Sequence, residues 1–192
     1  MNISFFGMCL PRTKPAWPNR MRRRHFLWGG GSLAAAFSLS PRLAIGSSAV
    51  EITMAGRPDG SRVWFNPYGM LIPPGQTVRW TNLDKANSHT ATAYVPQNDD
   101  HPRRIPVGAA PFDSDYLLPG KSFEVTLEIP GVYDYFCIPH EMSGMVGRII
   151  VAAPDQTEFE DYPPGELDQV VLDRFPAIAD ILANSPLHHE EN

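Results

Sequence analysis

Cysteine is scarce in this sequence, which contains only two in 192 residues. Two Cys cannot build the disulfide framework of a small secreted scaffold. They are also too few for a four-Cys zinc or iron–sulfur site. An excess of basic residues is absent as well, because the formal net charge is −5 at pH 7. A nucleic-acid-binding protein normally presents a basic face, so no nucleic-acid partner is expected.

Sustained helical periodicity is missing from residues 50–153. The chain instead has 20 Pro and 15 Gly, which mark turns between short β-prone runs. These runs lie at residues 51–54, 62–65, 76–81, 88–95, 122–129, 133–137 and 147–151. The pattern predicts an all-β domain, an antiparallel sandwich with Greek-key connections. The long segment 96–119 lacks the pattern and is expected to form an irregular excursion at one end of the sandwich.

Charge divides the chain into three parts. Residues 1–50 contain seven Lys and Arg and no acidic residue, whereas residues 155–192 contain ten acidic residues and one basic residue. This asymmetry predicts a basic leader over 1–49, a near-neutral domain over 50–153 and an acidic C-terminal extension over 154–192.

The leader has the parts of an export signal: a positive region, a modestly apolar stretch at 26–37 and small residues before residue 50. Its sequence Arg23-Arg24-His25-Phe26-Leu27 resembles the twin-arginine consensus, which implies export of the folded protein to the periplasm. Met21 is the expected initiator, in which case residues 1–20 are not translated. An uncleaved anchor is the alternative, but its apolar run is shorter than the ~20 residues of a membrane span, so no stable membrane insertion is expected after processing. Processing would leave Cys137 as the only cysteine.

One loop carries soft metal ligands. Cys137, His140 and Met145 have the spacing C-x2-H-x4-M directly after a predicted strand. With one more imidazole, these residues make up the His2Cys set with a weak axial Met that binds electron-transfer copper. His89 is the candidate for that imidazole. Met142 is a rival axial ligand in the same loop, although the spacing favours Met145.

The stretch YDYFCIPHEMSGMVGRIIV at 133–151 resembles the copper loop of the plastocyanin, pseudoazurin and amicyanin group of cupredoxins. The sequence GQTVRWTN at 75–82 and the following His89-Thr90 also fit that family. The resemblance covers about residues 50–153. It implies a Greek-key β-sandwich (the cupredoxin fold) of about seven to eight strands holding one type 1 copper, with the ligands His89, Cys137, His140 and Met145.

The sequence departs from the family after the first histidine ligand. Many members have Asn there, and its side chain braces the ligand loop, whereas this chain has Thr90. The bracing is therefore expected to be weaker, or to come from Asn82 or Asn87.

The resemblance implies a periplasmic protein that carries single electrons between a redox donor and an acceptor, and not an enzyme. A multicopper oxidase or a nitrite reductase needs additional His pairs, often beside the Cys, but Phe136 and Ile138 flank Cys137. A copper scavenger, chaperone or sensor is the alternative function. His140 is expected to lie nearest solvent as the contact edge for partners, within an apolar rim formed by Pro139, Met142, Met70 and Leu71.

The extension has apolar residues at helical spacing. It is expected to form two short helices, at 165–174 and 175–184, with Pro176 at the start of the second. These helices could pack on the flank of the sandwich, or they could dock a partner or a second copy. His188-His189-Glu190-Glu191 is expected to be disordered, and His101 is expected to be a solvated loop residue.

Overall fold

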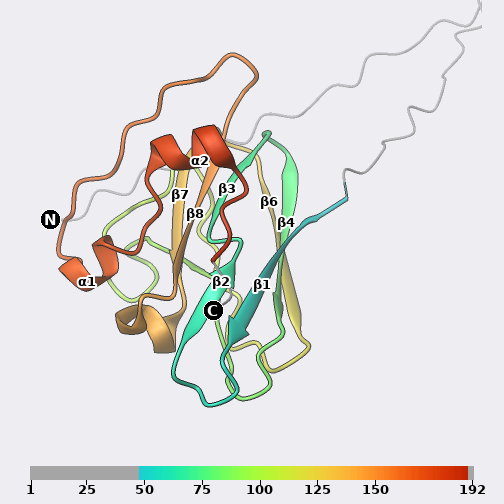
Figure 1. Ribbon diagram of the computed structural model, residues 1–192. Helices are drawn as coiled ribbons and strands as arrows, with labels where there is room; N and C mark the ends of the chain where they lie inside the picture. Colours follow the sequence, from blue (N-terminus) through green and yellow to red (C-terminus); the bar gives the residue numbers. More distant parts are fainter. Residues whose placement is uncertain (1–47, 190–192) are drawn as a thin grey trace, which may run out of the picture. The chain divides into compact units, whose positions relative to one another are not determined.

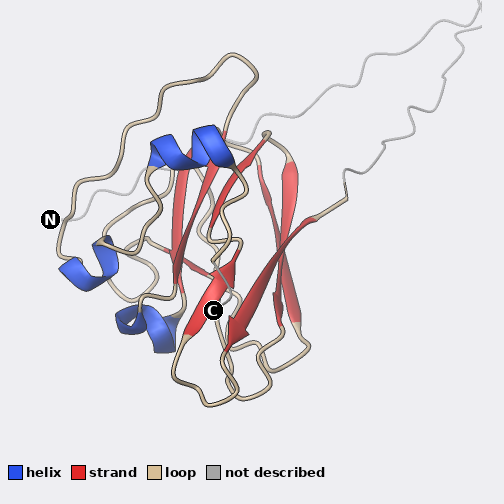
Figure 2. Ribbon diagram, in the orientation of Figure 1, coloured by secondary structure: helices blue, strands red, loops and turns tan. Residues whose placement is uncertain are grey.

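The computed structural model describes residues 48–189, so residues 1–47 of the predicted leader and the last three residues, 190–192, lie outside the described residues. Eight strands form two four-stranded sheets, and the helices are short (Figures 1 and 2). The first sheet has the order β2-β1-β4-β6, and its strands are β1 (Val50–Gly56), β2 (Val63–Asn66), β4 (Gln76–Asn82) and β6 (Ser122–Leu127). The second has the order β3-β8-β7-β5, with β3 (Gly69–Ile72), β5 (Thr92–Ala93), β7 (Gly131–Phe136) and β8 (Val146–Val151).

The predicted β-sandwich of about seven to eight strands is confirmed, but not all of its strands are antiparallel. β1 pairs with β4 in parallel, and β3 pairs with β8 in parallel, while the remaining pairs are antiparallel. Turn residues in a sequence indicate where strands end, but they do not indicate which strands become neighbours. Parallel neighbours arise when a connection crosses over, and such a connection has no local sequence signature.

The structure also differs from the predicted strands in two places. Within residues 88–95 only Thr92–Ala93 is a strand, because the backbone of His89 pairs with Leu117 of the excursion in an isolated bridge. β3 was not predicted, since the Pro67-Tyr68-Gly69 turn signal hides a short strand that pairs with β8.

The core lies between the two sheets, and in β4 buried residues alternate with half-buried ones. In β4 the inward residues are buried, and Val78 and Trp80 are fully so. The Trp80 ring contacts three aromatic rings, those of Phe112, Phe123 and Tyr135. Phe112 comes from the excursion, which therefore belongs to the folded domain as an ordered part of its core.

The C-terminal extension packs on the outer face of the second sheet, which confirms the first of its two predicted roles. Its helices are shorter than predicted: α1 spans Gln169–Leu172 and α2 spans Ile178–Asn184. Val171 of α1 packs with Phe136 and Val146, and Ile181 of α2 packs with Val132 and Ile150. Because the extension covers this face, most residues of β7 and all residues of β8 are buried. No helix within residues 48–189 is long and apolar enough to cross a membrane.

A buried ionic cluster joins the extension to the sheet. The carboxylate of Asp134 on β7 accepts hydrogen bonds from Arg148 Nε at 2.7 Å and from Arg104 Nε at 2.8 Å, and all three side chains are at most 2% exposed. Arg148 also donates to Asp161 at 2.7 Å and to the Pro176 carbonyl at 3.1 Å, both in the extension. Arg104 donates in the same way to the Pro163 carbonyl at 2.8 Å.

Replacing Arg148 by Met should lower the free energy of unfolding by about 3–5 kcal/mol, because it leaves the buried Asp134 carboxylate short of positive charge. Chemical denaturation measures the loss. The control is Arg79→Met on the half-exposed face of β4, where Arg79 pairs with Glu51 and Glu124. The control should cost far less, because ion pairs between solvent-exposed side chains contribute little to stability. Equal losses in the two variants would show that the buried cluster has no special role.

Candidate metal centre

The loop between β7 and β8 places three of the four predicted ligands. Cys137 caps the 3-10 helix η1 (Ile138–Ser143), His140 lies within η1, and Met145 directly precedes β8. The loop is closed by its own backbone, since the Cys137 N–H donates to the Met145 carbonyl at 3.0 Å and the Met145 N–H donates to the His140 carbonyl at 3.2 Å. Gly144 makes this turn possible, because its φ of 78° lies in the left-handed region that favours glycine.

Three donor atoms converge at this end of the sandwich. Nδ1 of His89 lies 3.5 Å from the Cys137 sulfur, Nδ1 of His140 lies 3.4 Å from it, and the two nitrogens are 3.2 Å apart. Donors that bind one ion at 2.0–2.3 Å are separated by roughly 3.1–3.8 Å when they subtend about 100–120° at the ion. The three side chains are therefore spaced as ligands of a single metal ion. They also form a His–Cys–His group of potential metal ligands within the described residues.

Asp84 determines how His89 presents its ring. The Oδ2 atom of Asp84 lies 3.0 Å from Nε2 of His89, and both side chains are buried. A carboxylate at Nε2 selects the tautomer that carries its proton there, so the lone pair of Nδ1 faces Cys137 and His140. Burial alone would raise the pKa of Asp84, but the hydrogen bonds from Asn87, the Ala86 N–H and His89 outweigh it and lower that pKa. Asp84 is thus a permanent acceptor, and the sequence analysis did not identify it.

Burial sets the protonation of the three donors. It raises the pKa of the Cys137 thiol to about 11, even though the Thr90 N–H points at the sulfur from 3.3 Å. Burial also lowers the pKa of His89 and of His140. Neutral imidazoles are competent ligands, whereas a thiol at pH 7 needs a bound cation before it becomes a thiolate. The donor set therefore fits a soft, thiophilic metal ion.

Thr90 braces the ligand loop, so the prediction that Asn82 or Asn87 would do so is wrong. Its hydroxyl accepts a hydrogen bond from the Ile138 N–H at 2.9 Å, and its own N–H points at the Cys137 sulfur. Asn82 instead donates to the carbonyls of Asn87 and Leu117, and thus shapes the loop that carries His89. The hydroxyl of Thr90 reaches the backbone of the ligand loop and takes the bracing role that the family gives to an asparagine amide.

The two candidate methionines differ in burial. Met145 is fully buried in the same apolar cluster as Cys137, while Met142 is 59% exposed. His140 is partly exposed and His89 is fully buried, as predicted. The predicted apolar rim is wrong for two residues, because Met70 is buried within β3 and the parallel pairing of β3 with β8 carries Leu71 away from the loop. Pro139 and Met142 remain exposed on the loop itself.

Three other histidines differ from expectation. His101 is not a solvated residue: its ring packs edge-on against Phe136, and its Nε2 lies 3.3 Å from the carboxylate of Glu141 in η1. His189 stacks on Tyr68 with ring centroids 4.1 Å apart, and His188 lies 2.8 Å from the Asn66 side-chain oxygen. The disorder predicted for the tail is therefore wrong for both residues.

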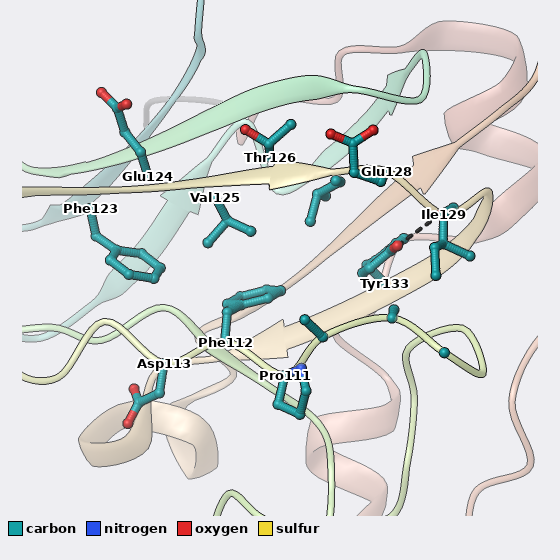
Figure 3. A pocket seen from close by; sticks show the side chains of 14 residues that line it. Pro111, Phe112, Asp113, Phe123, Glu124, Val125, Thr126, Glu128, Ile129 and Tyr133 are labelled. Carbon is teal, nitrogen blue, oxygen red and sulfur yellow. Dashed lines mark hydrogen bonds between the residues drawn. The ribbon is translucent and has the colours of Figure 1, made fainter. Parts of the chain in front are cut away.

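The geometry allows one other chemistry, that of a cysteine nucleophile. Asp84, His89 and Cys137 form a carboxylate–imidazole–thiol series of the kind that hydrolases use. Cys137 is fully buried, however, so a substrate has no access to the sulfur. A hollow of about 530 Å³ lies between β6 and residues 108–113, but its lining contains no His, Cys or Met (Figure 3). Apolar side chains such as Phe112 and Val125 line it together with the carboxylates Asp113, Glu124 and Glu128. The three-donor group of His89, Cys137 and His140 is therefore suited to a metal ion and not to a substrate.

Known proteins share these features. Residues 52–152 match the family described as copper binding proteins, plastocyanin/azurin family. The chain is 29% identical to the chloroplastic plastocyanin of Oryza sativa subsp. indica over 156 residues, which is 78% of this chain and 97% of the relative. It is 34% identical to the chloroplastic plastocyanin of Tetradesmus obliquus over 122 residues, 63% of this chain and 77% of the relative.

A solved structure is similar as well. The pseudoazurin from Methylobacterium extorquens AM1 matches with a TM-score of 0.43 and 23% identity, over 57% of this chain and 78% of that one.

Proposed function

Because the chain belongs to the plastocyanin/azurin family of copper-binding proteins, we propose that it carries single electrons between redox partners through one copper ion. The observation that supports this most is the convergence of a buried thiol with two imidazole nitrogens, all within 3.5 Å of one another. His89, Cys137 and His140 would hold the metal, with Met145 as the weak fourth ligand. Copper held by such a set gains or loses one electron.

The chain contributes a site that is positioned in advance. Asp84 orients His89, Thr90 holds the Cys137–Ile138 segment, and the backbone bond from Cys137 to Met145 closes the loop. Donors that are held in place move little when the charge of the site changes, and small movement keeps the barrier to electron transfer low. Burial of Cys137 and His89 excludes substrates, which favours a carrier over an enzyme.

His140 would be the contact edge for partners. It is the only partly exposed member of the three-donor group, and the exposed Pro139 and Met142 adjoin it on η1. Encounters over such a surface are small and short-lived, as rapid exchange between carriers requires. The donor and the acceptor are redox proteins of the same compartment.

Replacing Cys137 by Ser should abolish both the strong visible absorption of the copper-loaded protein and its reversible redox cycling, because a hydroxyl oxygen is a harder and poorer copper ligand. Absorption spectroscopy and voltammetry measure the two losses. Substitution of Cys9 should change neither, because the predicted leader is not part of the processed protein. A wild-type protein that holds only Cu(I) and stays colourless would instead favour a copper scavenger, chaperone or sensor.

Replacing Met145 by Leu should leave copper bound but raise the reduction potential, because the lost thioether helps to stabilise Cu(II) and an apolar replacement does not. The matched control is Met142→Leu, at the exposed methionine three residues earlier, which should leave the potential unchanged. Voltammetry of both variants shows which methionine is the axial ligand. A shift in the Met142 variant alone would mean that Met142 is the axial ligand.

We also propose that the protein acts in the periplasm after twin-arginine export, on the basis of Arg23-Arg24-His25-Phe26-Leu27. Replacing Arg23 and Arg24 together by Lys keeps the charge but removes both guanidinium groups, and it should block export of the protein. Cell fractionation measures the periplasmic share, and Arg22→Lys with Arg42→Lys, at the other two arginines after Met21 in the leader, is the matched control. Normal export of the Arg23 and Arg24 variant would exclude this route.

A further inference from the structure

A hollow of about 430 Å³ opens beside the metal loop. It is formed by three segments that are distant in the sequence: the turn between β1 and β2, the loop that carries His140, and the C-terminal extension. The edge of His140 lines it, together with Arg57, Arg62, Arg174 and His189. The hollow therefore borders the side chain that is proposed as the contact edge for electron transfer.

Among residues 48–189, the side chains that line this hollow carry positive charge and no negative charge. Three guanidinium groups line it, and none of these described lining residues is Asp or Glu. The chain as a whole has a net charge of −5, so this cluster of positive side chains is opposite in sign to the protein as a whole. Within residues 48–189, no ion pair involves Arg62 or Arg174.

Contacts hold two of these arginines in place. The Arg62 guanidinium lies over the Trp64 ring, 5.5 Å from its centroid, and its Nη2 lies 3.4 Å from Nδ1 of His189. The side chain of Arg174 crosses Gly144 so closely that a Cβ there would lie 2.7 Å from Arg174 Cγ. The guanidinium groups are thus preorganised, which lowers the entropy that is lost when they bind an anion.

The pKa of His189 reflects the positive charge of the neighbouring arginines. Its burial, and then the nearby charges of Arg62 and Arg174, lower the pKa of His189 to about 4. The ring is therefore neutral at pH 7 and adds no charge of its own. It stacks on Tyr68 and forms a fixed wall, so the positive character of the hollow comes from its arginines.

We propose that this hollow recognises carboxylate groups on a redox partner and draws an acidic docking face against His140. A guanidinium binds a carboxylate through two parallel hydrogen bonds, whereas the ammonium group of a lysine acts as a point charge and does not form this paired geometry. Complementary charge of this kind raises the rate of encounter and orients the partner. The proposal rests on the proposed electron-carrier function, because it takes His140 as the point of electron exchange.

The test uses two small oxidants of opposite charge. Ferricyanide is an anion that accepts one electron from the reduced copper protein and becomes ferrocyanide, and tris(phenanthroline)cobalt(III) is a cation that accepts one electron and becomes the cobalt(II) complex. Stopped-flow absorption measures both second-order rate constants at low and high salt. The test variant is Arg62→Gln with Arg174→Gln. The control is Arg79→Gln, which removes a guanidinium group on β4 that does not line the hollow.

In the double variant the rate with ferricyanide should fall about tenfold at low ionic strength, and the difference from wild type should shrink to less than about twofold in 0.5 M salt. The rate with the cobalt complex should stay equal or rise. Replacing both arginines by Lys keeps the charge and should restore most of the ferricyanide rate. A double variant that reacts with ferricyanide at the wild-type rate would overturn the proposal while leaving the electron-carrier function intact.

A second measurement does not depend on copper. Titration of the metal-free protein with ferrocyanide, followed by NMR, should shift the amide signals of Gly60, Ser61 and Gly144 and the indole N–H of Trp64. The double variant should lose these shifts. Shifts that are absent from the wild-type protein would overturn the proposal, whereas a wild-type protein that reacts with neither oxidant but shows the shifts would overturn only the electron-carrier function.

Discussion

Thr90 connects the two loops that carry the metal ligands, and the geometry of the metal centre depends on that connection. Its N–H points at the Cys137 sulfur, and its hydroxyl accepts the N–H of Ile138, the first residue of η1. His89 precedes Thr90 directly, and His140 lies one turn along η1. One residue therefore sets the positions of both imidazoles relative to the thiol. Because the ligands are held in this way before any metal arrives, the site can change charge with little rearrangement.

The C-terminal extension completes the domain in a way that also alters the metal-binding end. It buries the outer face of β7 and β8 through Val171 and Ile181, and the buried cluster of Asp134, Arg104 and Arg148 joins it to the sheet. The same docking brings Arg174 and His189 to the hollow beside His140. The acidic extension thus places one basic side chain, Arg174, beside His140.

Chemistry that is encoded in neighbouring residues could be predicted from the sequence. The spacing of Cys137, His140 and Met145 in one loop limits where their side chains can go, so the ligand loop could be recognised without a structure. Features that depend on a partner distant in the sequence could not be predicted. The strand β3, the short extent of the strand within 88–95 and the packing of His101 depend on pairing with β8, Leu117 and Glu141, and such pairing leaves no local pattern.

The sequence by itself determined the class of the protein: soft ligands at the end of a strand, a β-rich domain with many turns, and an acidic extension with helical spacing. Such features depend on residue type and short-range spacing, which a single chain displays openly. Only the tertiary structure decided that Asp84 orients His89, that Thr90 replaces the expected asparagine, and that three arginines meet beside His140. Each of these contacts depends on side chains that the folding of the chain brings together. The direction of a side chain, and the sheet pairing that sets it, are properties of the whole domain and not of the local sequence.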